Sequence, residues 1–583
     1  MVASPDEDGS VALVSSCQSV DNVQVSVAGV LALPQHKVRV KVRRVGGGFG
    51  GKIAHNIRIA SSAALGAMKT GQQVRFAVDR NSDFAMFGGR CDTRATYDFG
   101  YDDTGKIHAI DMTVNCLGGA WLESNWFELF GMISHVESVY DIPAVRVQFL
   151  LLRANVPPRT AVRAPGEPQA QLLMENIIEH VASLVGLPPH VVRERNMLVL
   201  TPGGGDGVTA LGKKVRADLY TMPRIWEELK ASSGFEARLA EVAAFNAENR
   251  WRKRGLSLVP SKYCLSPATR TAAVTIYPDG TVSIAHPGVE MGQGLITKVH
   301  QTAAYCLTQA LPPGSPPIDV GMFRSADSST VTLAFQSFTG GSTTSESACE
   351  AVRAACEELV SRMAAVDREK LGASYGWTQL VAASVGPMCG APGPIKLIAT
   401  ATGGPRRLDD GEGGTGYETY GAALAVAEVD VLTGDRRVLS VDLLYDTGKT
   451  LNPAIDIGQT EGAFVFGIGN LMSEAVGVEP ETGLSSTAST WKYAVPGVFD
   501  LPESFRVSLL RDSPLHAKGP ISSKAVGEPP MMLASSVLLA LQAACAEAAA
   551  GRAYRPLCAP ATAEAVKAAV GYASVREQLL EKE

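Results

Sequence analysis

Turn sequences that suit β-hairpins recur along the chain and are interleaved with helical patterns in no regular order. The turns lie between alternating or β-branched runs, at Tyr101–Lys106, Ile276–Thr281 and Asp430–Asp435. Apolar residues recur at the helical period in Pro168–Val185, Thr297–Leu311, Ser345–Ala364 and Pro530–Ala550. Because strands and helices do not alternate as βαβ units would, the sequence predicts an α+β fold.

Size and charge limit the class of protein. The 583 residues, 46% of them hydrophobic and 19% charged, have the composition of a folded globular protein. At about 100–200 residues per domain, this length predicts two or more domains. The run TPGGGDG at 201–207 is the best boundary, which divides the chain into domains 1–200 and 206–570. A net charge of -6 without a long basic run argues against nucleic-acid binding and against a membrane-surface role.

Cysteine usage and the start of the chain predict a reduced, cytoplasmic protein. None of the ten cysteines forms C-x-x-C, so zinc ribbons and iron–sulfur ligand runs are not expected within this chain. The N-terminal MVASPDEDGSVALVSS has acids where a signal peptide needs a basic start and an apolar core. The longest apolar run, Met531–Ala546, contains two serines and a glutamine and predicts a buried helix.

The sequence VRVKVRRVGGGFGGKI, residues 38–53, predicts a strand that runs into a glycine loop. Its glycines match the dinucleotide pattern G-x-G-x-x-G, but no carboxylate follows in GAMKTGQQVRF at 66–76. The loop also matches the Walker pattern, except that Ile53 replaces the Ser or Thr that would bind magnesium. Five glycines allow backbone N–H groups to approach an anion closely, and a tight turn without a ligand is the alternative.

Two further stretches combine small and polar residues, as ligand-binding segments do. In PGVEMGQG, residues 287–294, two glycines flank Gln293, so that backbone and side-chain amide can face one ligand. In TGGSTTSE, residues 339–346, hydroxyl residues lead into a helical pattern whose N-terminus suits a phosphate. A plain capping box of Thr343 with Glu346 is the alternative for this second stretch.

The segment KAVGEPP, residues 524–530, precedes the apolar helix and contains one acid, Glu528, among small and apolar residues. Burial and the helix N-terminus act on the charge of such a carboxyl in opposite directions. A general base must be ionised before it accepts a proton. Glu528 is therefore a candidate base, and simple capping of the helix is the alternative.

Taken in order, these stretches resemble one family, the molybdenum-binding region of xanthine dehydrogenases and aldehyde oxidases. The resemblance covers nearly all of the 583 residues. The matching blocks are RVGGGFGGK, PPRTAVRAPGEPQ (157–169), LVGLPPHVVRERNM (184–197), GVEMGQGLITK, TLNPAIDIGQTEGAFVFG (450–467), FRVSLLRDSP (505–514) and SSKAVGEPP. The family implies two elongated lobes of mixed sheets and helices with a molybdopterin cofactor between them.

The resemblance also implies roles for single residues, which the residue patterns alone leave open. Glu528 matches the catalytic glutamate of the family. Gln18, the backbone N–H of Phe49 and Arg163 match groups near the molybdenum that are not its direct ligands. The remaining residues that match cofactor-binding positions are Gly48, Gly50, Gly292, Gln293, Gly294, Ser342, Thr343, Thr344 and Gln459.

In that family the molybdenum carries a sulfido ligand, an oxo ligand and a hydroxide. The glutamate takes the proton of the hydroxide, whose oxygen attacks an electron-poor carbon while hydride passes to Mo=S. Water thus supplies the oxygen of the product. The resemblance predicts a molybdopterin-dependent oxidoreductase that hydroxylates an aldehyde or an N-heterocycle, with the cofactor supplying the hard chemistry.

Three positions depart from the xanthine-specific pattern. Ile53 stands where those members carry a glutamate, Gly131 where they carry an arginine, and Pro165 where they carry a phenylalanine. The two charged groups orient a purine, so their loss favours aldehydes or other heterocycles. The residues of the KAVGEPP block resemble those of xanthine dehydrogenases, which would imply a role in purine catabolism. Xanthine therefore stays an alternative substrate.

Full-length members of the family begin with two 2Fe-2S clusters and an FAD domain, whereas this chain starts inside the molybdenum region. The resemblance therefore implies an N-terminally truncated first domain, and Fe–S and flavin domains on partner subunits or on a missing part of the chain. A homodimer of the full assembly and a small-molecule substrate are expected, without nucleic-acid or membrane partners. A non-catalytic remnant or assembly subunit is the competing hypothesis, and nucleotide binding at the glycine loop is a third.

Overall fold

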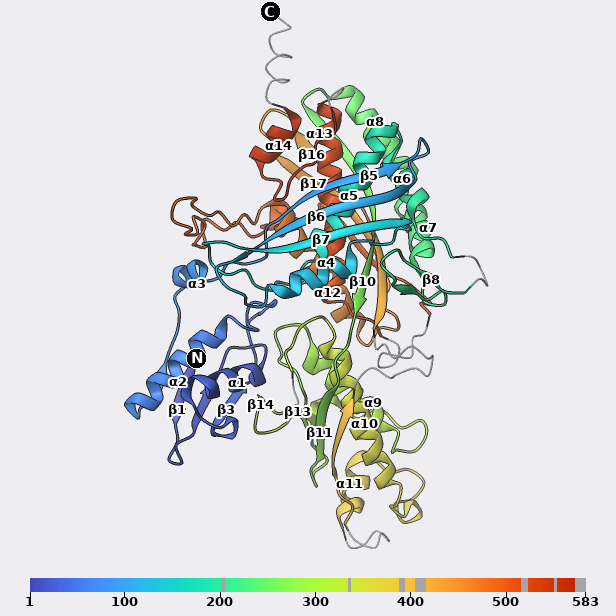
Figure 1. The fold of residues 1–583 in the computed structure, drawn as a ribbon. Coiled ribbons are helices and arrows are strands. Elements are labelled where there is room, and N and C mark those ends of the chain that lie inside the picture. Colours follow the sequence, from blue (N-terminus) through green and yellow to red (C-terminus); the bar gives the residue numbers. More distant parts are fainter. Residues whose placement is uncertain are drawn as a thin grey trace, which may run out of the picture. The chain divides into compact units, whose positions relative to one another are not determined.

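The computed structural model describes residues 1–200, 205–333, 337–386, 394–403, 416–514, 523–549 and 553–571. Helices and strands follow one another irregularly along these residues, and the strands form several small sheets (Figure 1). Parallel and antiparallel pairs occur in the same sheets. The predicted α+β class is confirmed.

Two compact units are present, each assembled from segments that are far apart in the sequence. The first unit comprises Met1–Val78, Leu265–Tyr417 and Ala517–Ser523, with the gaps given above. The second unit comprises Asp79–Cys264, Glu418–His516 and Lys524–Glu583. Part of the predicted boundary, 201–204, lies outside the described residues. The division into 1–200 and 206–570 therefore stays a prediction.

One sheet of the first unit joins five short strands in the order β14-β3-β2-β1-β4. The strands are β1 (Val2–Pro5), β2 (Val11–Val14), β3 (Val38–Val42), β4 (Val74–Arg75) and β14 (Ser328–Ser329). In β3 the valines are buried, while Arg39 and Lys41 are exposed, because alternate side chains of a strand face opposite sides. This is the strand predicted ahead of the glycine loop. The helical elements beside it are α1 (Val20–Leu31), α2 (Asn56–Thr70) and η1 (Gln35–Lys37).

The other sheet of the first unit has the order β13-β12-β11-β15. Its strands are β11 (Arg270–Ile276), β12 (Val282–Ala285), β13 (Phe323–Ser325) and β15 (Ile398–Gly403). The predicted hairpin at 276–281 is confirmed, since β11 and β12 pair antiparallel. Helix α10 packs so closely on this sheet that a Cβ on Gly403 would lie 2.1 Å from the backbone nitrogen of Ala351. The helices are α9 (Leu295–Thr308), α10 (Thr344–Met363), α11 (Trp377–Val385), η2 (Val320–Met322) and η3 (Arg368–Leu371).

Three long strands form one sheet of the second unit, with α4 and α5 beside it (Figure 1). They are β5 (Thr93–Tyr101), β6 (Ile107–Gly119) and β7 (Ala144–Arg153), and β5 and β6 form the hairpin predicted at 101–106. The helices of this part are α3 (Arg80–Met86), α4 (Trp126–His135), α5 (Glu167–Val185) and α6 (Pro189–Asn196). The helix predicted from Pro168 therefore begins one residue earlier, at Glu167.

A second sheet of this unit has the order β10-β16-β17-β18. Its strands are β10 (Arg252–Leu265), β16 (Tyr417–Asp430), β17 (Arg436–Tyr445) and β18 (Ser504–Leu509), and the turn predicted at 430–435 joins β16 to β17. Alternate residues of β16 face two different hydrophobic cores: Ala422 and Leu424 belong to one, and Ala423 and Ala425 to the other. A strand that is buried on both faces has a continuous run of apolar residues in its sequence, and β16 has such a run.

The remaining elements of the second unit are α7 (Met222–Ser233), α8 (Phe235–Glu248), α12 (Pro453–Met472), α13 (Ser535–Ala548), α14 (Ala563–Val570), β8 (Gly207–Val208), β9 (Lys214–Val215), η4 (Val498–Asp500) and η6 (Pro529–Ala534). Together η6 and α13 form a stretch, Pro529–Ala548, that is long and apolar enough by composition alone to cross a membrane. However, 78% of its apolar window is buried inside the protein. The stretch is a core helix, as predicted for this run.

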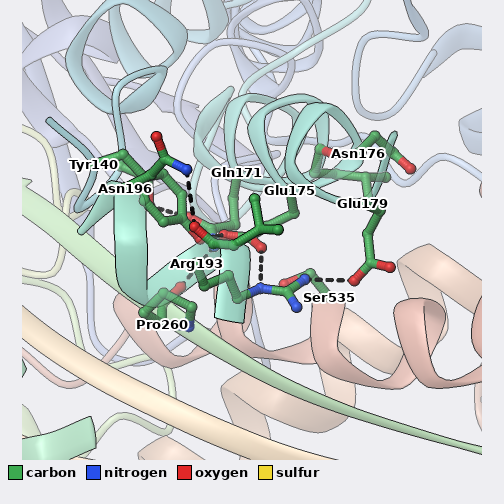
Figure 2. Close-up of polar contacts among 12 residues, drawn as sticks. Tyr140, Gln171, Glu175, Asn176, Glu179, Arg193, Asn196, Pro260 and Ser535 are labelled. Carbon is green, nitrogen blue, oxygen red and sulfur yellow. Dashed lines mark hydrogen bonds and ion pairs between the residues drawn. The ribbon is translucent and has the colours of Figure 1, made fainter. Parts of the chain in front are cut away.

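A buried polar network links α5 to α6 (Figure 2). Arg193 of α6 donates from Nε to Glu175 and from Nη2 to Glu179, each at 2.7 Å. Tyr140 donates its hydroxyl proton to Glu175 at 2.6 Å. Burial alone would lower the pKa of Arg193, but the charges of Glu175 and Glu179 hold it well above its ordinary value. The block LVGLPPHVVRERNM therefore has a structural role, since it carries the arginine of this network.

Candidate functional site

The glycine loop of the first unit is held by Gln18. The Oε1 atom of Gln18 accepts hydrogen bonds from the backbone N–H groups of Gly50 at 3.0 Å and Lys52 at 3.1 Å. A Cβ on Gly48 would lie 2.6 Å from the same oxygen, so only glycine fits at that position. The structure therefore brings the predicted Gln18 and the predicted loop glycines together.

Phe49 lies in this loop in the left-handed conformation, with φ of 52°, and half of its surface is exposed. Residues other than glycine avoid that conformation, at a cost of about 1–3 kcal/mol. Such strain persists where the surroundings impose it, and it concentrates at functional sites. The strain supports a functional role for the Phe49 backbone, whose contact with a metal-bound oxygen stays a prediction.

Thr339 joins three of the predicted segments within the first unit. Its backbone N–H donates to the Gln18 carbonyl at 2.7 Å, and its own carbonyl accepts from Gln18 Nε2 at 2.8 Å. Its hydroxyl oxygen accepts from the N–H of Val289 at 2.9 Å. The glycine loop therefore meets both the 287–294 segment and the 339–344 segment through one threonine.

Glu290 occupies the backbone donors of the 287–294 segment. Its carboxylate accepts from the N–H groups of Gly292 at 2.9 Å, Gly294 at 3.2 Å and Ile296 at 2.9 Å. These donors lie at the N-terminus of α9, which favours negative charge. The group that these donors bind in this structure is a side chain of the same protein, and the predicted contact of Gly292 and Gly294 with a cofactor stays a prediction.

The side chain of Gln293 is folded back on its own loop. Its Oε1 accepts from the N–H of Met291 at 2.6 Å, and its Nε2 donates to the carbonyl of Val289 at 3.0 Å. In this arrangement the Gln293 amide shapes the loop between two glycines. The predicted contact of Gln293 with a cofactor stays a prediction.

Ser342, Thr343 and Thr344 lie where the third segment enters α10. The hydroxyl oxygen of Thr344 accepts from Arg270 Nη2 at 3.2 Å. Burial lowers the pKa of Arg270 to about 10, so this guanidinium is still charged at neutral pH. A helix N-terminus with a buried cation beside it suits an anion such as phosphate.

The capping-box alternative for this segment is wrong. Thr343 is the N-cap residue of α10, yet its side chain makes no capping hydrogen bond in the part of the chain that the structure describes. Glu346 instead accepts from the Tyr417 hydroxyl at 2.8 Å. Burial raises the pKa of Glu346 to about 8, so this carboxyl is mainly protonated at neutral pH.

In the second unit, Arg163, Gln459 and Glu528 lie together. Arg163 donates from Nε to the carbonyl of Gly527 at 2.6 Å and from Nη2 to the carbonyl of Gln459 at 3.2 Å. Burial lowers the pKa of Arg163 to about 10, and the nearby Glu528 carboxylate acts in the opposite direction. The three residues predicted for this unit therefore lie together around the partly buried Arg163 guanidinium.

Glu528 is buried, and both of its carboxylate oxygens have partners in this unit. Oε1 accepts from the N–H of Ala164 at 3.1 Å, and Oε2 lies 3.3 Å from the hydroxyl of Tyr263. Ala164 itself has φ of 56°, which is a second strained residue at a candidate site. The alternative that Glu528 merely caps the following helix is wrong, because its side chain makes no capping hydrogen bond among the described residues.

The segment that carries Glu528 is anchored by a buried ion pair. Lys524 Nζ donates to Asp446 Oδ2 at 2.6 Å, and both side chains are fully buried. The N–H of Lys524 donates to the carbonyl of Thr447 at 2.8 Å, and Tyr445 donates to the carbonyl of Ala525 at 2.6 Å. The end of β17 therefore fixes the start of KAVGEPP, four residues before the candidate base.

Gly131 of α4 has no room for a side chain. A Cβ there would lie 2.0 Å from the carbonyl oxygen of Pro165 and 2.8 Å from the carboxyl carbon of Glu167. An arginine at this position would require the helix or the turn around Pro165 to move. Ile53 in the first unit is 7% exposed and contributes only an apolar side chain. Neither position supplies the charge of the xanthine-specific pattern.

Two residues of this unit were missed by the sequence reasoning. Tyr263 of β10 and Glu167 at the start of α5 share a hydrogen bond of 3.1 Å beside Glu528. Along the chain, 96 positions separate Tyr263 from Glu167 and 265 separate it from Glu528. Tyr263 lies in a run that reads as an ordinary buried strand, so no local signal indicated it.

Comparison with known proteins identifies the family. A sequence profile described as a molybdopterin cofactor-binding domain matches residues 1–197, and a second profile with the same description matches residues 228–502. The chain belongs to the molybdenum hydroxylase family. The region that it represents is the one that binds the molybdopterin cofactor.

Curated relatives of this molybdenum hydroxylase chain include plant aldehyde oxidases. An indole-3-acetaldehyde oxidase of Arabidopsis thaliana is 36% identical over 550 residues, which make up 93% of this chain and 40% of that protein. The abscisic-aldehyde oxidase of the same plant is 38% identical over 554 residues, 94% of this chain and 40% of that protein. The chain therefore spans about 40% of the length of the relatives it matches.

Solved structures share the fold of this molybdenum hydroxylase chain. The quinoline 2-oxidoreductase from Pseudomonas putida 86 superposes with a TM-score of 0.82 at 23% identity, over 98% of this chain and 73% of that one. The aldehyde oxidoreductase from Desulfovibrio gigas gives a TM-score of 0.79 at 21% identity, over 98% and 59%. At these identities the likeness shows the fold alone.

The residues of the first unit fit the cofactor of a molybdenum hydroxylase. At Gly48 the Gln18 amide takes the space that a Cβ would fill, so the loop backbone packs directly against Gln18, which holds the loop in its shape. The N–H groups that receive the Glu290 carboxylate show that this backbone binds an anion. Thr344 with the buried Arg270 offers a second position of the same kind for a phosphate.

Proposed function

We propose that the chain is the molybdenum-bearing part of an enzyme that oxidises an aldehyde, with Glu528 as the catalytic base. The observation that carries the proposal is the placement of Glu528, a buried carboxylate that Ala164 N–H orients beside the Arg163 guanidinium. A base needs such a fixed direction and shelter from water. The names of curated relatives that are aldehyde oxidases support the substrate class.

The residues of the chain bind, orient and move a proton, and the cofactor supplies the two-electron oxidation chemistry when it is bound. In the first unit, Gln18 and Thr339 hold the glycine loop in the shape in which its backbone faces the cofactor. In the second unit, Glu528 accepts the proton of the water-derived hydroxyl group that attacks the carbonyl carbon. Arg163 holds the Gly527 carbonyl and so keeps the neighbouring Glu528 in place.

Gly131 of the second unit and Ile53 of the first unit support an aldehyde rather than xanthine as the substrate. Gly131 leaves no room for a purine-orienting arginine, and Ile53 is apolar where a glutamate would be needed. An uncharged carbonyl compound does not require either charge. A neutral N-heterocycle meets the same condition and is the second substrate class to test.

The experiment is to purify the full chain from cells that make the cofactor and to measure its molybdenum content and dye-linked aldehyde oxidation. We expect Glu528→Gln to keep the molybdenum and to lose turnover by about 10²–10⁴-fold, the contribution of a general base. The control is Glu248→Gln, an exposed acid at the end of α8, which should behave as the unaltered protein.

Two outcomes would contradict the proposal. Unchanged turnover in Glu528→Gln would remove Glu528 as the base. A folded chain that takes up no molybdenum would instead favour the rival, a non-catalytic remnant or assembly subunit. The first result concerns only the assignment of Glu528, and the second concerns the proposed function, so the two can be distinguished.

We also propose that partner subunits or further domains with 2Fe-2S clusters and FAD receive the electrons, in a homodimeric assembly. Support comes from the 40% share of the relatives' length that the chain spans. Iron, flavin and molybdenum should co-elute in size-exclusion chromatography of the complex isolated from its own cells. A cytoplasmic location is proposed because nine described cysteines are free thiols, and fractionation of cells tests it.

A further inference from the structure

A second buried carboxyl group lies next to the proposed base in the second unit. Glu167, the first residue of α5, is 7% exposed, and its Oε1 lies 3.1 Å from the hydroxyl oxygen of Tyr263. The same hydroxyl lies 3.3 Å from Oε2 of Glu528. One phenol therefore stands between two carboxyl groups. Both distances are longer than the roughly 2.5–3.0 Å that is usual for such bonds.

No cation pairs with Glu167 within the described residues. Its Oε2 has no hydrogen-bond partner there, and burial raises its pKa well above the ordinary value, followed by the charges of Glu528 and Glu128. Glu128 faces it from α4, and Arg163 is bonded to two carbonyl groups. Hydrogen bonds with its own backbone N–H and with Tyr263 lower this pKa, but burial and the two neighbouring carboxyl charges outweigh them, so these surroundings favour the neutral acid.

The histidine that packs on Tyr263 is neutral as well. The ring of His135 lies 4.7 Å from the Tyr263 ring, centre to centre. Cys264 N–H donates to His135 Nε2 at 2.8 Å, so the proton of the neutral ring is on Nδ1, which lies 2.8 Å from the carbonyl of Gly131. Burial lowers the pKa of His135 to about 3. This ring therefore brings no positive charge to the two carboxyl groups.

The direction of the hydrogen bonds follows from these charges. Tyr263 has one hydroxyl proton, and an ionised carboxylate accepts more strongly than a neutral acid does. If Glu528 is the ionised base, the Tyr263 hydroxyl donates to Glu528, and its oxygen is then free to accept from Glu167. We propose that Glu167 is held as a neutral acid that donates to Tyr263, and that Tyr263 donates to Glu528 and so positions the catalytic carboxylate.

Glu167 and Tyr263 are positioning residues in this arrangement, which rests on the proposed role of Glu528. Ala164 N–H fixes one oxygen of Glu528, and the Tyr263 hydroxyl fixes the other. Glu528 then accepts a proton in the reaction while Glu167 keeps its own. As the pH rises through the raised pKa of Glu167, a second carboxylate forms and competes for the Tyr263 proton. Activity should therefore fall on the alkaline side.

Infrared spectroscopy of the full chain tests the protonation of Glu167 without any need for turnover. At neutral pH, the difference spectrum between the unaltered protein and Glu167→Gln should show the carbonyl stretch of one protonated carboxylic acid. That band should shift in Tyr263→Phe, because its hydrogen-bond partner is lost. Absence of the band, or a band that Tyr263→Phe does not shift, would overturn the inference.

Kinetics of the cofactor-loaded protein tests the positioning role. Glu167→Gln retains an N–H donor for Tyr263, so its kcat should stay within about threefold of the unaltered protein, without the alkaline decline. Glu167→Met and Tyr263→Phe lack the donor or the bridge, and each should lower kcat about tenfold or more with little change in KM. The double variant Glu167→Met with Tyr263→Phe should lose no more than either alone.

Two results would count against the positioning role: equal losses in Glu167→Gln and Glu167→Met, or an unchanged alkaline decline in Glu167→Gln. If Glu167→Met does not fold, the Glu167→Gln pH profile and the infrared band still decide. Absence of molybdenum-dependent turnover in the unaltered protein would be a failure of the proposed function. In that case the infrared band would still establish or refute the neutral Glu167.

Discussion

At Gly131, a single methyl group would decide whether the second unit can pack. The position lies inside α4, and its missing Cβ would meet the Pro165 carbonyl at 2.0 Å. Gly462 lies inside α12, and a Cβ there would meet no atom within 4 Å. The two helical glycines therefore differ only in what surrounds them, and they form a matched pair.

We expect Gly131→Ala to lower the free energy of unfolding by about 1–3 kcal/mol, because a backbone oxygen cannot yield as a flexible side chain does. Gly462→Ala should raise it by about 0.5–1 kcal/mol, since alanine loses less entropy than glycine in a helix. The measurement is the midpoint of urea unfolding, compared between variants whose free energy of unfolding depends on urea concentration with the same slope. A stable Gly131→Ala variant would mean that α4 can shift away from the turn, which would weaken the argument against a larger residue there.

Residues within short motifs were predictable, and residues that act through distant contacts were not. Four predicted residues each lie in a short motif that resembles the family: Gln18, Gly48, Arg163 and Glu528. The structure places them in the two clusters described above. Tyr263 has no such block. Its importance depends on two carboxyl groups that the fold brings to one hydroxyl.

At the scale of elements, the arginine of α6 shows how a helix pair can depend on one charge. Arg193 is 1% exposed and Glu175 is fully buried, so removal of the arginine leaves carboxyl groups without their cation. Such a loss costs far more than the loss of an exposed pair. Arg437 and Glu503, which are paired on the surface at 55% and 51% exposure, provide the comparison within the same unit.

We expect Arg193→Met to lower the free energy of unfolding by about 3–5 kcal/mol. Arg437→Met removes a guanidinium of the same kind from the surface and should cost less than about 1 kcal/mol. Chemical denaturation followed by circular dichroism measures both. Similar costs for the two variants would show that the buried network does not hold α6 to α5.

Helices and hairpins were predicted with their ends within a few residues, because periodicity and turn chemistry are local. The helix predicted at Thr297–Leu311 is Leu295–Thr308, and the one at Ser345–Ala364 is Thr344–Met363. The capping predictions failed for a physical reason. Glu346 and Glu528 bind groups from other parts of the chain, Tyr417 and Ala164, which a local pattern does not contain.

At the scale of the whole molecule, buried acids set how stability depends on pH. Burial raises the pKa of Glu346 to about 8 and that of Glu128 to about 7, against an ordinary value near 4.3 for glutamate. At a pH between the unfolded and the folded pKa of such a group, the folded protein keeps the proton on the carboxyl group, whereas the unfolded chain has released it. The stability from each group is therefore complete below about pH 4 and is lost as the pH rises through the folded value.

We expect the melting temperature to fall from pH 5 to pH 8, and Glu346→Gln to reduce that slope. A glutamine cannot ionise and still accepts from the Tyr417 hydroxyl. For one group that titrates fully, the slope is about 1.4 kcal/mol per pH unit. Near pH 4 the two proteins should be equally stable, which is the internal control. If the melting temperatures of the two proteins fell in parallel as the pH rises, Glu346 would be ionised in the folded protein.

The two compact units were beyond the reach of the sequence. The first unit combines Met1–Val78 with Leu265–Tyr417, and no composition signal in the sequence joins these two segments. Local composition marks a loop, but it does not record which distant segments pack together. The pairing of β3 with β14, which come from two segments of that unit far apart in the sequence, is such a long-range contact.

Glu290 bears on the order in which the protein matures. Its carboxylate accepts from three backbone N–H groups at the start of α9, so the chain itself satisfies these donors. The polypeptide can therefore complete this part of its fold first and receive its prosthetic group afterwards. Any other anion that binds these three N–H groups would have to displace the Glu290 carboxylate first.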